Sequence, residues 1–161
     1  MKDETSLDEV SVFGGKLSFL IPHDWEETET EQSNVYLYSQ PKTDSGWFRV
    51  SLNTSTGTAV SDPPAERLKR IFEKRENVSR DERTGNLVHA YERDSEEDGV
   101  QIHLYYWIVA NVVEPNLVRE AVFSYTVLHE RINDEDTVRI VGLLRQLVSQ
   151  AYFNPAIQTP D

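Results

Sequence analysis

The chain has no cysteine, so disulfides, thiolate metal ligands and thiol nucleophiles are unavailable to it. No apolar run approaches the roughly 20 residues that a membrane-spanning helix needs. The N-terminal segment from Met1 to Val10 is polar and acidic, whereas a secretory leader has a basic segment followed by an apolar one. These absences predict a soluble, cytoplasmic protein that depends on its hydrophobic core for stability.

Basic residues are also scarce, because 16 Lys and Arg stand against 28 Asp and Glu, giving a formal charge of −12. The resulting field repels phosphate backbones and anionic headgroups, so neither nucleic acid nor a membrane is expected as a partner. Acids are dense near the start of the chain, and four of them form a candidate site for a protein partner: Glu26, Glu27, Glu29 and Glu31. The plainer interpretation is a solvated acidic surface.

The chain, at 161 residues, has the size of one domain. We expect a flexible acidic N-terminus over residues 1–9, a single domain over 10–153 and a tail over 154–161. Gly14-Gly15 predicts a hairpin turn between strands at 10–13 and 16–21. The acidic stretch 24–31 is expected to be a loop or a short irregular helix. Strands at 34–38 and 47–54 then flank a turn at 41–46, and residues 55–61 have the composition of a loop.

Two helices are predicted from apolar stripes at helical spacing. The first follows Asp62-Pro63-Pro64, a capping residue with prolines suited to the first turn. Its stripe is Ala65, Leu68, Ile71 and Phe72, and Arg67 is placed on its solvated side. The second runs from about Asp134 to Tyr152, with a stripe formed by Val138, Ile140, Val141, Leu143, Leu144, Leu147, Val148 and Ala151.

Between the helices, short turns join four strands at 78–83, 86–94, 100–113 and 117–128, which predicts an antiparallel meander. If Asp98-Gly99 and Pro115-Asn116 each occupy the central turn positions, three tyrosines line up across three strands: Tyr91, Tyr106 and Tyr125. They are the candidate ligand-binding residues, as the floor of a pocket between the sheet and a helix. Ordinary cross-strand packing is the alternative.

On this register both faces of the meander carry apolar residues, including Leu104, Ile108 and Phe123 on one face and Trp107, Val109 and Val122 on the other. Each face needs a cover, and two helices are available. The fold class is therefore α+β, a single-domain α/β/α sandwich. Its central antiparallel sheet has about six to eight strands, with one helix after the fourth strand and one at the C-terminus. Trp25, Trp47 and Trp107 are expected in the core.

The order of these elements, together with the segment from Leu17 through Pro22 to Trp25 and the segment Phe123-Ser124-Tyr125, resembles the PsbP-like family over about residues 10–153. That family includes an extrinsic photosystem protein, a Ran-binding nuclear import factor and small bacterial proteins, some of them adaptors for secreted toxins. The resemblance implies an α/β/α sandwich and a role in binding rather than catalysis. It supplies no catalytic residue to transfer to this chain.

No motif of catalysis or cofactor binding is evident. There is no Gly-x-Ser-x-Gly turn and no glycine-rich phosphate loop. The acids of Asp94 to Gly99 imitate the start of a calcium loop, but Tyr105 stands where the last ligand should be, so an acidic hairpin tip is expected. The four histidines lie on separate segments without metal-ligand spacing: His23, His89, His103 and His129. We therefore predict no metal site and no cofactor.

Two functions follow as hypotheses. The first is a non-catalytic protein-interaction module, such as an adaptor, chaperone or neutralising factor, that presents a sheet edge, a helix flank or the acidic segment to another protein. The second is a small-molecule binding protein that uses the tyrosine pocket. An enzyme is not expected. A homodimer formed by pairing of sheet edges is a further hypothesis.

Overall fold

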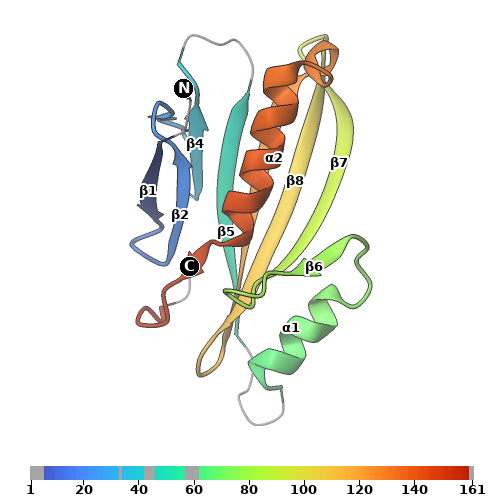
Figure 1. Ribbon diagram of the computed structural model, residues 1–161. Helices are drawn as coiled ribbons and strands as arrows, with labels where there is room; N and C mark the ends of the chain where they lie inside the picture. Colours follow the sequence, from blue (N-terminus) through green and yellow to red (C-terminus); the bar gives the residue numbers. More distant parts are fainter. Residues whose placement is uncertain (1–5, 33, 42–45, 57–61, 160–161) are drawn as a thin grey trace.

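The described residues of the protein form two antiparallel sheets and two α-helices (Figure 1). The computed structural model describes residues 6–32, 34–41, 46–56 and 62–159, so most of the turn predicted at 41–46 and of the loop predicted at 55–61 lies outside the described residues. The elements are β1 (Leu7–Val12), β2 (Leu17–Pro22), β3 (Glu26–Thr28), β4 (Val35–Ser39), β5 (Trp47–Thr56), α1 (Pro64–Phe72), β6 (Val78–Arg80), β7 (Leu87–Glu97), β8 (Val100–Val113), β9 (Leu117–Leu128), the 3-10 turn η1 (His129–Arg131), α2 (Glu135–Ser149) and β10 (Tyr152–Phe153).

The larger sheet has seven strands in the order β3-β4-β5-β9-β8-β7-β6, and the smaller has three in the order β1-β2-β10. The α+β class, the predicted hairpin and the antiparallel meander are confirmed. The loop or irregular helix expected at 24–31 is wrong in part, because β3 forms there by pairing with β4. Three residues at a sheet edge owe their conformation to that pairing, which local composition does not reveal. The first helix consequently follows β5 rather than a fourth strand.

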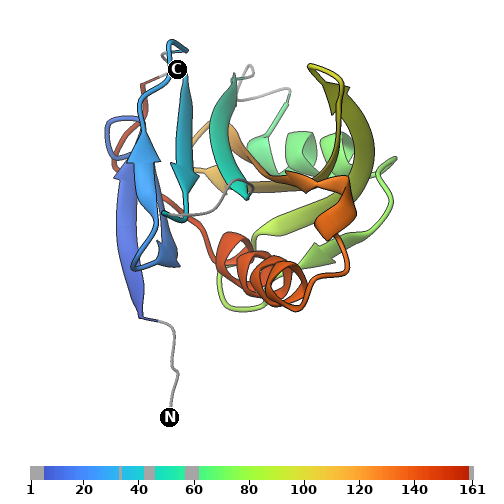
Figure 2. The ribbon, with the colours of Figure 1, turned by 90° about the horizontal axis from the view of Figure 1, so that it is seen from above.

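The two helices lie on opposite faces of the seven-stranded sheet, as Figures 1 and 2 show together. One face, here called the closed face, packs against α2 and the three-stranded sheet. Its core joins Phe48, Trp107 and Phe123 to Phe19 of β2 and Leu144 of α2. The α/β/α order of layers is therefore confirmed. The three-stranded sheet, which the prediction did not separate, extends the layer that contains α2.

The helix stripes are confirmed with three exceptions, one of which is Ala65 of α1, an exposed residue. In α2, Ile140, Leu144 and Val148 are buried, but Val138 is 59% exposed. In α1, Leu68 and Phe72 are buried as expected, and so is Arg67, which was placed on the solvated side. The Arg67 guanidinium donates to the carbonyl oxygens of Asp62 (2.6 Å), Ser55 (3.2 Å) and Asn116 (2.5 Å). It thereby ties α1 to the turn between β8 and β9.

The register of the meander agrees with prediction at one hairpin and differs at the next. Tyr91 opposes Tyr106 across β7 and β8, as expected from Asp98-Gly99. Across β8 and β9, however, Val113 pairs with Leu117, so the connection has three residues rather than two, and Tyr106 opposes Ser124. A shift of one residue sends every side chain of a strand to the other face. Phe123 and Tyr125 therefore lie on the closed face, and Val122 shares its face with Leu104 and Ile108.

The expectation that the helices cover both faces completely is wrong for the second face. There α1 packs on one end only, over Leu87, Ala110 and Val118. A helix of nine residues is about 14 Å long, whereas the 14-residue strand β8 extends roughly 46 Å. The remainder of that face has no helix over it within the described part of the chain, and Figure 1 shows α1 confined to one end. We call this uncovered part the open half.

Candidate functional site

The open half forms a groove of about 500 Å³ across four neighbouring strands, with the end of β7 at its margin. Its wall and floor mix apolar side chains with hydroxyl groups and a few charges. The lining residues are Val35, Leu37, Trp47, Arg49, Ser51, Glu97, Ile102, Leu104, Tyr106, Val122, Ser124 and Thr126. Apolar and polar side chains contribute in equal number, a mixture that protein-interaction surfaces also show.

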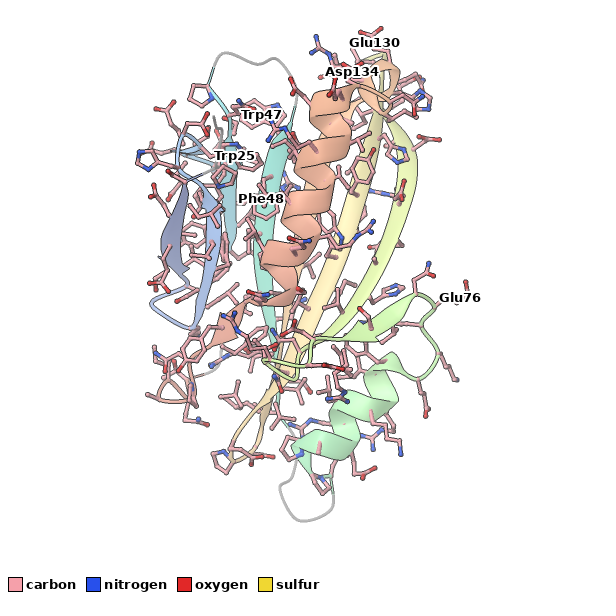
Figure 3. All side chains as sticks on the ribbon, viewed as in Figure 1. Trp25, Trp47, Phe48, Glu76, Glu130 and Asp134 are labelled. Atoms are coloured by element: carbon pink, nitrogen blue, oxygen red, sulfur yellow. The ribbon has the colours of Figure 1, made fainter. Side chains whose placement is uncertain are left out.

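Trp47 is the large exposed aromatic side chain of this groove. It is 41% exposed, which contradicts its expected place in the core, whereas Trp25 and Trp107 are buried as predicted. The next residue, Phe48, is fully buried on the closed face beside Trp25, with 5.9 Å between ring centroids. Figure 3 labels these three side chains around β5. Because successive strand residues point to opposite faces, β5 holds Trp47 in the groove while Phe48 anchors the strand in the core.

The register places Arg49, Ser124, Tyr106 and Tyr91 side by side across β5, β9, β8 and β7. Ser124 is small and buried, so it leaves a floor between Arg49 and the Tyr106 ring. No hydrogen bond or ion pair reaches Arg49 from the residues that the structure describes, and its side chain is exposed. The groove thus contains a cation that has no ion-pair partner in the part of the chain that the structure describes.

A second guanidinium lies on the other side of this floor. Arg93 of β7 donates from Nη2 to the Tyr106 hydroxyl at 3.1 Å, and its Cζ lies 5.5 Å from the centroid of the Tyr106 ring. The Tyr106 ring also stacks on Tyr91, with centroids 4.7 Å apart. These contacts fix the orientation of Tyr106 at the edge of the groove.

Two of the three predicted tyrosines, Tyr91 and Tyr106, also line a hollow of about 660 Å³ beside the edge of β7. Tyr105, Trp107 and Arg145 of α2 contribute to the same hollow. Burial raises the pKa of Tyr91 and of Tyr105, so both hydroxyl groups stay protonated at neutral pH. The structure therefore brings Tyr91 and Tyr106 together at the edge of β7, with both side chains on the face opposite α2.

Tyr125, the third predicted tyrosine, lies away from the other two. It opposes Tyr105 rather than Tyr106, and its ring stacks on Trp25 in the closed-face core with centroids 5.9 Å apart. Burial raises its pKa to about 12. The predicted row of three tyrosines is thus corrected to a pair, for the reason given by the three-residue connection after β8.

The four acidic candidates do not share one surface. Glu26 and Glu27 are consecutive residues of β3 and point to opposite faces, with Glu26 on the same face as Trp47. Glu29 and Glu31 follow β3, and all four side chains are exposed. Burial raises the pKa of Tyr38, and the negative charge of Glu27 raises it further. A role in partner binding for these acids stays a prediction.

The histidines bring a charged cluster together on the closed face near η1. His103 lies between two carboxylates, with Nδ1 2.7 Å from Asp94 Oδ1 and Nε2 2.8 Å from Glu92 Oε1. His129 Nε2 lies 3.4 Å from the same oxygen of Asp94. Burial lowers the pKa of His103, but the hydrogen bonds to Asp94 and Glu92 together outweigh it, so the pKa is raised overall. These contacts describe a protonated imidazole held by acids.

Among residues 6–32, 34–41, 46–56 and 62–159, no group of three or more His, Asp and Glu side chains is arranged to hold a metal ion. Within the same described residues, no helix has both the length and the apolar character needed to cross a membrane.

Sequence reasoning missed the groove, although two signals for it were available. Phe48, Val50 and Leu52 alternate with Trp47, Arg49 and Ser51, and the polar members of the second set show that Trp47 shares a solvated face. The lengths of the helices give a second signal, since nine residues cannot cover a 14-residue strand. The position of Ser124 in the floor of the groove depends on the β8–β9 register. The two-residue turn predicted from the sequence gives a different register and so could not reveal it.

Comparison with known proteins gives matches in structure only. No protein-family model matches the chain, and no curated protein matches its sequence. A solved structure from Bacteroides thetaiotaomicron matches with a TM-score of 0.57 and 18% identity, covering 91% of this chain and 48% of that protein. This chain therefore spans about half the length of that protein.

Two further structures match along nearly their whole length. LpqN of Mycobacterium tuberculosis, described as involved in cell envelope biogenesis, has a TM-score of 0.55 and 12% identity, covering 95% of this chain and 93% of LpqN. The Ran-binding protein Mog1p of Saccharomyces cerevisiae has a TM-score of 0.55 and 10% identity, covering 93% of this chain and 96% of Mog1p. The chain has the PsbP-like/Mog1p fold that its resemblance to the PsbP-like family predicted.

Proposed function

We propose that the protein is a non-catalytic interaction module whose open half of the sheet binds a partner protein. The observation that carries this proposal is the groove of about 500 Å³ on a face that α1 covers at one end only. Exposed apolar surface in a solvated setting is typical of interaction sites. Trp47, exposed and aromatic, and Arg49 are residue types that dominate the energy of binding interfaces.

The fold supports a binding role by analogy, because Mog1p, which shares it, is described as Ran-binding. The groove differs from the surfaces that the sequence suggested, namely a sheet edge, a helix flank and the acidic segment. Those surfaces are charged or short within the described residues, whereas the open half offers an aromatic anchor and a continuous floor. An adaptor or chaperone role would use the same surface. The proposal places the protein in the cytoplasm.

Site-specific photocrosslinking tests the proposal. A p-benzoylphenylalanine at position 47 should give a discrete adduct with one partner in native cells or lysate. The matched control is the same residue at position 138, which is 59% exposed on α2 and lies away from the groove. No adduct at position 47, or identical adducts at both positions, would contradict the proposal.

A second candidate function rests on the hollow beside β7, whose volume of about 660 Å³ lies within the range of small-molecule sites. The Tyr91–Tyr106 stack and Arg145 would supply a flat apolar wall, hydroxyl groups and a positive charge. A ligand that binds only the folded state raises the melting temperature. A metabolite library should then contain a compound that raises it for the wild type and less for Tyr106→Phe. Uniform melting curves across the library would exclude this candidate.

A further inference from the structure

The charge of the groove identifies the kind of segment that fits it. Arg49 is its cation, in a chain of net charge −12, and no partner neutralises it among the described residues. A segment that covers the groove takes this guanidinium out of water. Leaving a charge buried without a partner is costly, whereas a hydrogen-bonded carboxylate removes that cost. An occupant of the groove is therefore favoured when it brings a carboxylate to Arg49.

The positions of the charges support the same conclusion. Arg49 on β5 and Arg93 on β7 lie on either side of the floor formed by β9 and β8. The carboxylates on this face lie away from the Arg49 level: Glu97 is at the end of β7, Glu26 is on the edge strand β3, and Glu120 lies toward α1, where it pairs with Arg75. The middle of the groove is thus positive and its margin negative. Arg93 donates to the Tyr106 hydroxyl and is held beside that ring, whereas Arg49 has no hydrogen bond or ion pair among the described residues.

The apolar lining defines what flanks the carboxylate. Trp47 and Leu104 lie two residues along the strands from the Arg49 level, toward the open end, and Val35 and Val122 lie two residues along toward α1. A segment in extended conformation that lies along the strands meets apolar groups before and after it meets Arg49. This spacing matches a strand-like peptide in which an acidic side chain stands between large apolar side chains.

We propose that the open half binds an extended protein segment in which an Asp or Glu side chain, flanked by bulky apolar side chains, pairs with Arg49. This inference rests on the proposed function, since it assigns the chemistry of the partner at the same surface. The guanidinium offers a planar, bidentate match to a carboxylate, which a lysine would not reproduce.

A displayed peptide library tests the inference on the full chain. Random dodecapeptides fused through their C-termini carry no free terminal carboxylate, so an acidic side chain must supply the charge. The library should enrich sequences with an Asp or Glu between apolar residues. A synthetic peptide of that sequence should bind at least about tenfold more tightly than its Gln or Asn counterpart, as expected for one charge-assisted pair.

Variants of Arg49 show where the carboxylate binds. On Arg49→Gln the acidic peptide and its amide counterpart should bind equally, and on Arg49→Glu a lysine-containing version should be preferred. Arg139→Gln, an exposed substitution on α2, should leave the preference unchanged. Thermal melts of the variants check that the fold is intact.

The outcomes separate the inference from the proposed function. Peptides that lose affinity on Trp47→Ala but show no preference for a carboxylate, or a preference that survives Arg49→Gln, would overturn the inference and leave the binding face in place. Failure to enrich any peptide, or binding that is indifferent to Trp47→Ala, would overturn both.

Discussion

Trp47 and Phe48 are neighbours in β5 that serve opposite faces of one sheet: Phe48 is fully buried, whereas Trp47 is 41% exposed. The ring of Phe48 stacks on Phe123 with centroids 5.7 Å apart and meets Trp25 edge-on. No such ring contact joins Trp47 to the described residues. Two large aromatic residues of one strand thus differ in what they contribute, one to stability and the other to the surface.

This relationship predicts unequal effects of two alanine substitutions. Phe48→Ala should lower the free energy of unfolding by about 3–5 kcal/mol, because it leaves a cavity in the closed-face core. Trp47→Ala should change it by less than about 0.5 kcal/mol, since exposed positions contribute little. Urea unfolding followed by circular dichroism measures both. Equal losses would show that Trp47 is part of the core.

Loss of the buried Asn86 amide should have a large effect on the free energy of unfolding. Its Nδ2 donates to the carbonyl oxygens of Ala151 (2.7 Å) and Ser149 (3.1 Å), and its Oδ1 accepts from Asn111 Nδ2 (2.8 Å). Asn86→Leu should cost about 1–3 kcal/mol, because it leaves buried carbonyl groups at the end of α2 without donors. Asn53→Leu, at an exposed position of β5, is the control and should stay within about 0.5 kcal/mol of wild type. A neutral Asn86→Leu would refute this role.

The His103 cluster predicts a dependence on pH. The folded-state pKa of His103 is raised above its ordinary value of 6.5, with hydrogen bonds to Asp94 and Glu92 outweighing burial. Its stabilising contribution is therefore complete below about pH 6.5 and is lost as the pH rises through the folded-state pKa. The ring should titrate above 6.5 by NMR, and Asp94→Asn should lower the midpoint. A midpoint below 6.5, or one unaffected by Asp94→Asn, would contradict this assignment.

The position of Tyr125 can be tested through Gly46. A Cβ at Gly46, whose φ is +88°, would lie 2.5 Å from the Tyr125 hydroxyl oxygen. Gly46→Ala should therefore destabilise the protein by at least about 1 kcal/mol through strain and overlap. In the Tyr125→Phe background the cost should be smaller, because the overlapping oxygen is gone. A cost that is identical in the two backgrounds would place the Tyr125 ring elsewhere.

The sequence was sufficient for the parts of the fold that short-range turn chemistry determines. Asp98-Gly99 correctly predicted that Tyr91 opposes Tyr106, and Gly14-Gly15 predicted the first hairpin. Prediction failed at Glu114-Pro115-Asn116, because this composition suits a connection of two residues as well as one of three. The length of the connection decides the register, and a change of one residue sends every side chain of β9 to the other face. The strand β3 depends on pairing with β4, and the register that places Ser124 beside Tyr106 depends on the same turn.

The candidate site was less predictable than the fold for a related reason. The sequence interpretation assumes that both faces of the sheet are covered, and it therefore places Leu104 and Trp47 in a core. The helix α1 is too short to cover its face. The alternating pattern of β5 and the length of α1 both indicate that part of one sheet face is uncovered. The strand register is also needed to locate the groove and to place Arg49 at its centre.

Methyl NMR spectra of the protein, recorded with and without the partner that position 47 captures, test the binding face most directly. If the open half binds the partner, the methyl groups of Ile102, Leu104 and Val122 should shift while those of Leu144 and Val148 beneath α2 stay in place. Shifts confined to Leu144 and Val148, or to the exposed Val138 on α2, would contradict binding at the open half.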